Sequence, residues 1–290
     1  MQRLETVAIV GVGLIGGSIG LALRSRGLAA RVVGVGRDLK TLQQAQDRGI
    51  IDQATTDLEA GVAEAEVVVV CTPVSRIPHD VRRAAQAVPA GALVTDAGST
   101  KRQIVETIES QPAAADVFVG AHPIAGSERA GAAHARAGLL RDRVCVLTPT
   151  PRTAAARLQR ARDFWGGLGC RMLEMSPIEH DEVLAYTSHL PHAMAAALAS
   201  SVPAEWLALA AGAYRDGTRV AAADAALWTA IFRDNRGPLL KALGTLEERV
   251  AAFKYAVMTD DEDAIRQWWD QARHRRRLFE ARQPSANQDD

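Results

Sequence analysis

The sequence predicts an α/β fold, in which a doubly wound sheet is followed by an all-α domain. Three observations lead to this prediction. Short apolar runs alternate with helical patterns through residues 1–175. A glycine-rich turn joins the first apolar run to the first helix. From Ser176 onward the strand patterns vanish, and alanine- and leucine-rich helical periodicity takes over. A chain of 290 residues has the length for two such domains.

The expected strands are short, and a helical segment follows most of them. The third, residues 66–72, is almost continuously apolar, which is typical of a strand covered by helices on both faces. Asp38 is expected to cap the helix that runs to Arg48, and Ser99 or Thr100 the helix 101–109. The strands are expected at 6–10, 31–35, 66–72, 92–96, 117–121, 144–147 and 171–174, with further helices at 16–26, 75–88 and 153–168.

The second half is expected to be entirely helical. Its helices are predicted at 179–200, 203–213, 222–257 and 260–280, with Gly237-Pro238 as a candidate break in the third. The last ten residues are polar without apolar spacing. We therefore divide the chain into a dinucleotide-binding domain (1–175), an all-helical domain (176–280) and a disordered tail (281–290).

Charge and composition exclude several classes of function. The 34 lysines and arginines balance the 34 aspartates and glutamates, so no net field draws the chain to nucleic acid or to a membrane. No apolar run approaches the ~20 residues of a membrane span, and residues 1–5 lack a signal pattern. Cys71, Cys145 and Cys170 show no CxxC spacing, which favours buried reduced thiols. We expect a cytoplasmic enzyme with a small-molecule substrate.

The glycine-rich turn predicts a nucleotide site. Gly11, Gly13 and Gly16 lie between an apolar strand and an amphipathic helix, the order of a Rossmann-type dinucleotide-binding unit. Amides at the helix start would bind the pyrophosphate. An ordinary glycine-rich turn is the alternative, and the flanking strand and helix argue against it. Cofactor contacts are assigned to Gly11, Gly13, Leu14, Ile15, Gly16, Arg37, Thr72 and Pro73.

The end of the second strand bears on cofactor choice. An NAD enzyme would place an acid there against the ribose 2′-hydroxyl, whereas this chain has Gly36-Arg37. A guanidinium suits a 2′-phosphate, so NADP is the preferred cofactor and NAD the alternative. In the NAD alternative, Arg37 is merely solvated. Asp38 is either a helix cap only or a residue that still reaches the ribose.

His122 is the strongest candidate for proton transfer. It follows the apolar run 117–120 and precedes Pro123, so a strand delivers it to the ligand edge of the sheet. A nicotinamide reaction needs a group that takes a substrate proton as hydride leaves, and an imidazole suits that near neutral pH. Ser99 follows the preceding strand and would reach the same hydroxyl. The alternatives are a packed histidine and a plain helix cap.

The helical half adds two polar segments. His189 and His192 lie three residues apart, but no carboxylate accompanies them at a metal-binding spacing, so no metal is expected. The segment 214–219 places charges around a glycine. This is either a solvated turn or a site where Arg219 clamps a carboxylate through two hydrogen bonds.

Taken in order, these motifs resemble the prephenate and arogenate dehydrogenases of tyrosine biosynthesis. The resemblance runs through the glycine turn, residues 95–101, 122–128 (His-Pro-Ile-Ala-Gly-Ser-Glu), 188–192 (Ser-His-Leu-Pro-His), 216–219 and Trp228, and covers about residues 6–255. It implies hydride transfer to NAD(P) and oxidative decarboxylation of prephenate to 4-hydroxyphenylpyruvate. It also implies a homodimer formed through the helical domain, which agrees with alanine-rich helices that cannot bury their apolar faces alone.

The resemblance also implies roles for individual residues. His122 would handle the proton of the ring hydroxyl, and Ser99 would bond that hydroxyl and His122. The implied substrate-binding residues are Arg219 on a carboxylate, Asp216 orienting that arginine, His192, Gly212 and Trp228 in the pocket wall, and Ser127 and Glu128 at the pocket mouth.

Two departures from the family pattern affect these expectations. The connection between His192 and Asp216 is short, and Ala211-Gly212-Ala213 replaces a richer glycine run, so the pocket wall is expected to differ there. His192 is present where some arogenate-specific members carry an apolar residue, which favours prephenate over arogenate. The remaining alternatives are a related hydroxy-acid or imine dehydrogenase, and a nucleotide-sensing protein without chemistry, against which the polar set argues.

Overall fold

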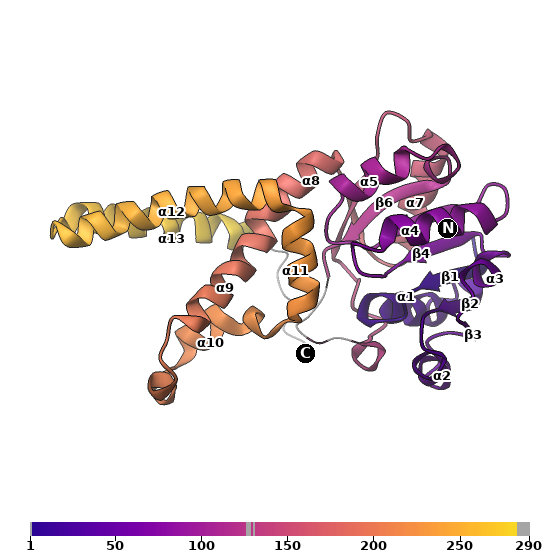
Figure 1. Cartoon of the computed structure of the whole chain (residues 1–290), viewed down its shortest axis with the longest axis horizontal. Helices are drawn as coiled ribbons and strands as arrows, with labels where there is room; N and C mark the ends of the chain where they lie inside the picture. The colour runs from indigo at the N-terminus through magenta and orange to yellow at the C-terminus, as the bar shows by residue number, and fades with distance from the viewer. Residues whose placement is uncertain (1, 126–128, 130, 283–290) are drawn as a thin grey trace. The chain divides into compact units, whose positions relative to one another are not determined.

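The computed structural model describes residues 2–125, 129 and 131–282. The chain forms two compact units, residues 1–239 and residues 240–290. The first unit contains the sheet and the helices up to α11 (Figure 1). Within the described residues, no helix combines the length and apolar character needed to cross a membrane.

An eight-stranded sheet forms the centre of the first unit. Its order is β3-β2-β1-β4-β5-β6-β7-β8, and all neighbouring strands are parallel except β6 and β7. The short edge strand β3 was not expected. The strands are β1 Leu4–Val10, β2 Ala29–Val35, β3 Gln53–Thr55, β4 Val67–Val70, β5 Leu93–Asp96, β6 Phe118–Pro123, β7 Val144–Thr148 and β8 Arg171–Glu174.

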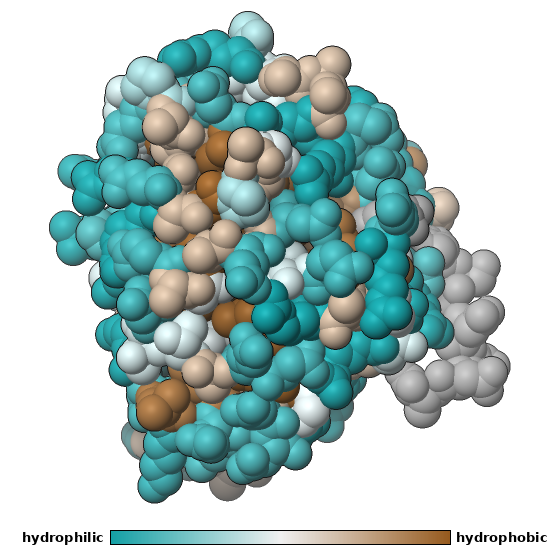
Figure 2. All heavy atoms as spheres, turned by 90° about the vertical axis from the view of Figure 1, so that its right-hand side faces the viewer, coloured by the Kyte–Doolittle hydropathy of each residue, from teal (hydrophilic) through white to brown (hydrophobic). Residues whose placement is uncertain are grey.

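Helices cover both faces of this sheet, as the apolar runs predicted (Figure 1). Alternate residues of β1 serve opposite cores: Val7 joins one cluster with Trp165 of α7, and Ala8 joins the other with Val81 of α4. The α/β helices are α1 Leu14–Ser25, α2 Leu39–Asp47, α3 Leu58–Val62, α4 Ile77–Ala87, α5 Arg102–Glu109, α6 Pro112–Ala115 and α7 Ala155–Gly167, with a 3-10 turn at Ala132–His134. Figure 2 shows the face on the right-hand side of Figure 1, and its surface is mainly hydrophilic.

One expected helix is interrupted. Instead of continuing through 179–200, the chain forms α8 (Pro177–Leu184), a π-helical turn (Ala185–His189) and α9 (Leu190–Ser200). Pro191 has no N–H to donate to the carbonyl four residues earlier, which favours a local change in helical hydrogen bonding. Such π turns are frequent at functional sites.

Two further helix predictions were wrong in detail. Residues 203–213 do not form one helix: a 3-10 turn (Ala204–Leu209) and α10 (Gly212–Thr218) are separated by an extended Ala211. A second 3-10 turn (Arg219–Ala222) follows α10. The next break lies at Asn235, between α11 (Ala225–Asp234) and α12 (Arg236–Met258), and not at Gly237-Pro238. Pro238 lies in the first turn of α12, where its missing N–H costs little.

The second unit consists of most of α12 and of α13 (Glu262–Arg282). Trp268 joins the two helices: its Nε1 donates to the Arg249 carbonyl at 3.1 Å, and its ring lies 4.6 Å from that of Phe253. The helix α13 extends two residues into the segment that was expected to be disordered, and residues 283–290 lie outside the described residues.

Candidate functional site

The glycine turn is held against the sheet by close backbone contacts. Gly11 has φ +96°, and a Cβ there would lie 2.9 Å from the Cys71 carbonyl. A Cβ on Gly16 would lie 2.2 Å from the Gly11 carbonyl oxygen. At Gly13, by contrast, a Cβ would meet no atom within 4 Å. The turn therefore leaves open space beside Gly13, at the start of α1, where a pyrophosphate would fit.

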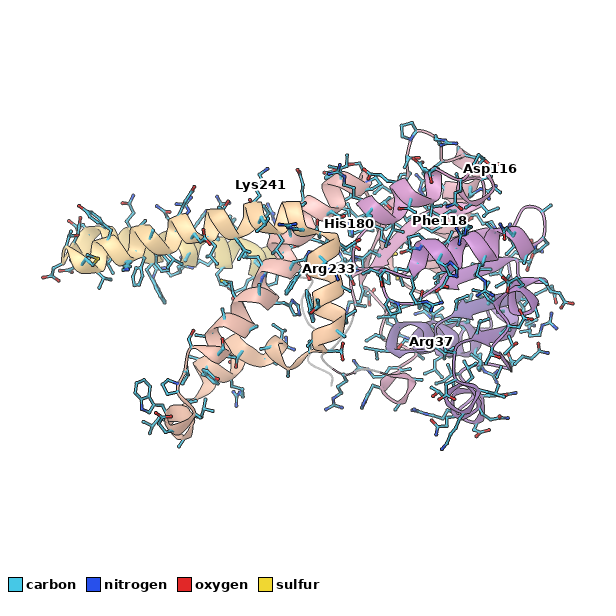
Figure 3. All side chains as sticks on the ribbon, viewed as in Figure 1. Arg37, Asp116, Phe118, His180, Arg233 and Lys241 are labelled. Atoms are coloured by element: carbon cyan, nitrogen blue, oxygen red, sulfur yellow. The ribbon has the colours of Figure 1, made fainter. Side chains whose placement is uncertain are left out.

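A cavity of about 490 Å³ adjoins this turn. Its position beside β1, β2 and β4 is the switch point of the sheet, where doubly wound folds bind nucleotides. Leu14 and Ile15 begin α1 next to it. The lining includes five of the predicted cofactor residues, Gly11, Gly13, Arg37 (Figure 3), Thr72 and Pro73, together with Arg76, Asp80 and Arg83.

The two carboxylates of this cavity are already hydrogen-bonded. Asp38 caps α2, as expected: it accepts from the Lys40 amide at 2.9 Å and the Thr41 hydroxyl at 2.7 Å. The Thr41 hydrogen bond is the main cause that lowers the pKa of Asp38. Asp80 accepts from Thr72 at 2.8 Å and from Arg76 at 3.1 Å. Arg37, in contrast, is exposed at the rim.

The loop after β5, which carries Ser99, is fixed by a buried ion pair. Asp96 and Lys101 are both fully buried and bond each other. The other Asp96 oxygen accepts from the Ala121 amide at 3.0 Å, directly before His122. This pair therefore ties the half-buried Ser99 loop to the strand of the predicted proton acceptor.

The expected capping of α5 by Ser99 or Thr100 was wrong. No side chain of its own loop caps this helix; instead, Asp181 of α8 accepts from the Lys101 amide at 2.8 Å and the Arg102 amide at 2.9 Å. A carboxylate at the positive end of a helix is a stronger acceptor than a hydroxyl. The cap thus comes from a residue about eighty positions away.

His122 is the first member of a chain of three side chains. Its Nδ1 lies 2.9 Å from Nε2 of His180 (Figure 3), and Nδ1 of His180 lies 2.7 Å from Oδ1 of Asp181. Burial, His180 and Lys101 lower the pKa of His122 well below 6.5. Burial also lowers the pKa of His180 to about 2. Both rings are therefore neutral near pH 7.

A further buried histidine stands beside this chain. Asn235 donates to the Asp181 carbonyl at 2.7 Å and lies 3.0 Å from Nδ1 of His189. His189 is 1% exposed, and burial lowers its pKa to about 4. It lies close enough to His122 for its charge to oppose protonation of that ring.

The predicted wall residues gather around Trp228. The His192 ring stacks on it with centroids 3.7 Å apart, and His189 meets it edge-on at 6.1 Å. Nδ1 of His192 bonds the Ser188 carbonyl at 2.8 Å. Burial is the main cause that lowers the pKa of His192, and the charge of nearby Arg219 lowers it further. The structure thus brings His122, His189, His192, Trp228 and Arg219 into one neighbourhood.

Two of the remaining predicted residues lie on α10. Gly212 begins α10, and Asp216 accepts from Arg215 at 3.4 Å with both side chains exposed. The expected role of Asp216 in orienting Arg219 stays a prediction. Ser127 and Glu128 lie outside the described residues.

Sequence reasoning missed His180, Asp181 and Asn235. The available signal was weak: His180 lies four residues before the buried Leu184, so a histidine occupies the apolar face of a helix. Nothing in the sequence pairs position 180 with position 122. In the part of the chain that the structure describes, no three His, Cys, Asp or Glu side chains are grouped as a metal site.

Comparison with known proteins agrees with this geometry. The family model "Prephenate dehydrogenase, nucleotide-binding domain" matches residues 19–174, and "Prephenate dehydrogenase, dimerization domain" matches residues 176–271. A prephenate dehydrogenase of Bacillus subtilis is 30% identical over 98% of this chain and 79% of its own length. A cyclohexadienyl dehydrogenase of Zymomonas mobilis is 30% identical over 91% of this chain and 92% of its own.

Solved structures show the same likeness. A prephenate dehydrogenase from Aquifex aeolicus, in complex with hydroxyphenyl propionate and NAD+, superposes with a TM-score of 0.89 at 30% identity, covering 96% of this chain and 99% of that one. An arogenate dehydrogenase of Synechocystis gives a TM-score of 0.78 at 28% identity, over 95% and 100% of the two chains. The fold, the ordered motifs and these matches together show that the chain belongs to the prephenate dehydrogenase family of oxidoreductases.

Proposed function

We propose that this chain oxidises and decarboxylates prephenate to 4-hydroxyphenylpyruvate, with a nicotinamide cofactor as hydride acceptor. The observation that carries the proposal is a neutral, partly buried His122 at the carboxyl end of β6, at the same sheet edge as the glycine turn. The name of the Aquifex complex, with hydroxyphenyl propionate and NAD+, supports an aromatic acid and a nicotinamide as ligands here.

The chain's own groups supply orientation and proton transfer. A nicotinamide held beside the glycine turn would supply the hydride acceptor for the ring carbon that carries the hydroxyl. His122 takes the hydroxyl proton as that hydride leaves, and Ser99 hydrogen-bonds the same oxygen. The ring carboxylate leaves as carbon dioxide, its electron pair makes the ring aromatic, and the proton returns to the phenolate oxygen. Because aromatisation drives the reaction, the protein mainly holds the substrate in place.

Substrate recognition is assigned to the helical side of the site. Arg219 binds a substrate carboxylate, while His192 and Trp228 form an aromatic wall against the ring. The family resemblance assigns Gly212 and Asp216 to the pocket wall and to the orientation of Arg219, and Ser127 and Glu128, which lie outside the described residues, to the pocket mouth. Residues 1–175 thus hold the nucleotide, and residues 176–280 provide substrate contacts and dimerisation.

NADP is proposed as the preferred cofactor. Arg37 is exposed at the cavity rim, where Asp38 already uses both oxygens on α2. A 2′-phosphate would therefore meet the exposed guanidinium of Arg37, while the Asp38 carboxylate is engaged at the start of α2. We expect Arg37→Ala to reduce kcat/KM with NADP about tenfold, because one charged hydrogen-bonded contact is lost. The kcat/KM with NAD should stay almost unchanged. A wild-type preference for NAD that the substitution leaves unchanged would reject NADP preference.

The decisive assay combines two substrates with two cofactors. Reduction of NAD and NADP is followed with prephenate and with arogenate, which share the ring and differ only in a side-chain keto or amino group. We expect turnover with prephenate. Because relatives include a cyclohexadienyl and an arogenate dehydrogenase, a larger kcat/KM with arogenate would assign this chain to that alternative. No turnover with either substrate would refute the proposal.

We also propose a cytoplasmic homodimer. The match to a dimerization domain covers residues 176–271, and α12 and α13 carry large exposed apolar side chains, including Val250, Tyr255 and Trp269. Light scattering should give twice the mass of one chain. Trp269→Glu should weaken association, whereas Leu39→Glu, an exposed leucine of α2, should not.

A further inference from the structure

His180 and Asp181 form a buried pair to which the reaction outlined above gives no task. We propose that they are positioning residues that fix the tautomer of His122, so that Nε2 of His122 is unprotonated. The inference rests on the proposed role of His122 as proton acceptor. It follows from the donors and acceptors along the chain His122–His180–Asp181, taken from the buried end outward.

The first step is the state of Asp181. Its Oδ1 accepts from the Lys101 amide at 2.8 Å and its Oδ2 from the Arg102 amide at 2.9 Å. Backbone N–H groups only donate, so both oxygens act as acceptors. A carboxylate in that position requires the ring nitrogen 2.7 Å away, Nδ1 of His180, to be the donor.

The second step is the state of His180. This ring is fully buried, with the Lys101 ammonium and His189 nearby, and these surroundings lower its pKa to about 2. A neutral imidazole carries one proton, which Nδ1 holds for Asp181. Nε2 of His180 is therefore an acceptor. Across 2.9 Å it faces Nδ1 of His122, which must then be the donor.

The third step gives the consequence for His122. With its proton on Nδ1, its Nε2 has a lone pair and can accept a proton from a bound hydroxyl. The other tautomer would point a donor at that hydroxyl and could not act as a base. Either ring nitrogen of a neutral histidine can carry the proton, and the hydrogen bond made by one nitrogen fixes the state of the other, so the selection here comes from His180 and Asp181.

Asp181 also connects this ring to the second predicted catalytic residue. Its carboxylate holds the amides of Lys101 and Arg102, which directly follow the Ser99 loop, and its backbone carbonyl accepts from Asn235. One residue of α8 therefore orients the ring of His122 and anchors the loop of Ser99. The two groups that meet the substrate hydroxyl are aligned by the same carboxylate.

Variants of His180 separate positioning from mere packing. In His180→Gln, the side-chain carbonyl accepts from His122 and the amide donates to Asp181, so the hydrogen-bond polarity is kept. In His180→Leu the volume is similar but both bonds are lost. We expect kcat to fall about 100-fold or more for His180→Leu, with little change in KM, and to recover to within about tenfold of wild type for His180→Gln. His79→Leu, at an exposed histidine, is the control.

Two kinetic outcomes would overturn the inference. One is equal kcat in the leucine and glutamine variants when both have wild-type thermal stability. The other is a loss in His180→Leu that lies entirely in KM. If the leucine variant does not fold, the glutamine variant still decides: a kcat below about one hundredth of wild type in a folded protein contradicts the inference.

The tautomer itself is measured without substrate. Long-range proton–nitrogen correlation spectra of protein labelled with 15N-histidine distinguish protonated from unprotonated ring nitrogens, and His122→Asn assigns the signal. We expect unprotonated Nε2 in wild type and His180→Gln, and a shift toward protonated Nε2 in His180→Leu. Protonated Nε2 in wild type would overturn the inference. The expected spectrum in a protein that oxidises neither substrate would reject the proposed function and leave the tautomer assignment standing.

Discussion

The glycine turn and the histidine cluster lie at the same edge of the sheet, yet they are held in different ways. The turn is fixed by close backbone approaches of Gly16 to Gly11 and of Gly11 to Cys71, the residue directly after β4. The cluster is fixed by side-chain hydrogen bonds between residues far apart in the chain, such as His122 with His180. A site built from backbone groups tolerates substitution of neighbouring side chains, whereas a site built from side chains depends on each partner residue.

This difference also separates binding from chemistry. The turn offers amides and open space, which suit a phosphate that many dehydrogenases share. The cluster offers neutral imidazoles with assigned donors and acceptors, which suit a single proton transfer. Substitutions in one region should therefore leave the other function largely intact.

The largest expected effect is that of His122→Asn. Asparagine cannot accept the hydroxyl proton, so kcat should fall about 100- to 10,000-fold. Cofactor affinity, measured by calorimetry, should stay near wild type because the glycine turn is untouched. Survival of most activity would show that the proton leaves by another route, and a parallel loss of cofactor affinity would break the separation of the two regions.

A smaller effect is expected for Arg219→Ala. Loss of a charged, hydrogen-bonded contact to a substrate carboxylate should raise KM about 10- to 100-fold, with kcat less affected. Arg215→Ala is a matched control, since Arg215 is an exposed arginine of α10 that pairs with Asp216. An unchanged KM in Arg219→Ala would remove this residue from the site.

Two alanine substitutions test the glycine turn. In Gly16→Ala, the methyl would lie 2.2 Å from the Gly11 carbonyl oxygen, so the free energy of unfolding should fall by about 1–3 kcal/mol. In Gly13→Ala the methyl has open space, so stability should stay within about 0.5 kcal/mol while cofactor affinity falls. Denaturant melts and cofactor titrations measure both. Equal destabilisation by the two variants would contradict the backbone account of the turn.

A further expected effect is a pH dependence of stability carried by the cluster. Burial lowers the pKa values of His122, His180 and His189 below 6.5. Below that pH the unfolded chain therefore binds protons that the folded chain does not bind. Stability should therefore be highest above pH 6.5 and fall with decreasing pH, down to about pH 4 for His189 and about pH 2 for His180. Asp181, whose pKa burial raises, acts with the opposite sign.

Each neutral buried histidine contributes up to about 1.4 kcal/mol per pH unit within its window. Urea melts between pH 7 and pH 5 measure the slope, and His180→Gln should reduce it. A slope that is unchanged in this variant would show that His180 is protonated in the folded state, contrary to the account given above.

Local patterns predicted much of the α/β region. The glycine turn, the cap of α2 by Asp38 and most strands depend on residues close together in sequence, and they occur as expected. The three-residue strand β3 was missed, since its pairing with β2 decides its conformation. The helical half was less predictable, because the helices change or break at residues 185–189 and at Asn235, where the apolar pattern of the sequence continues.

The candidate site divides in the same way. His122 and Ser99 were placed at one sheet edge because parallel strands bring their carboxyl ends together. The partner of His122, the distant cap of α5 and the stack of His192 on Trp228 were not foreseen. These contacts join positions that are dozens of residues apart in sequence, and no local pattern records such a pairing.

By itself, the sequence determined the order of the elements and the nucleotide turn and singled out His122 as the proposed proton acceptor, because spacing and residue type express these directly. The tertiary structure alone decided which groups surround His122 and which carboxylate caps α5, and it carries the proposed position of the ring proton. Hydrogen bonds and desolvation act through space, so a donor, an acceptor and a pKa exist only once the chain has folded.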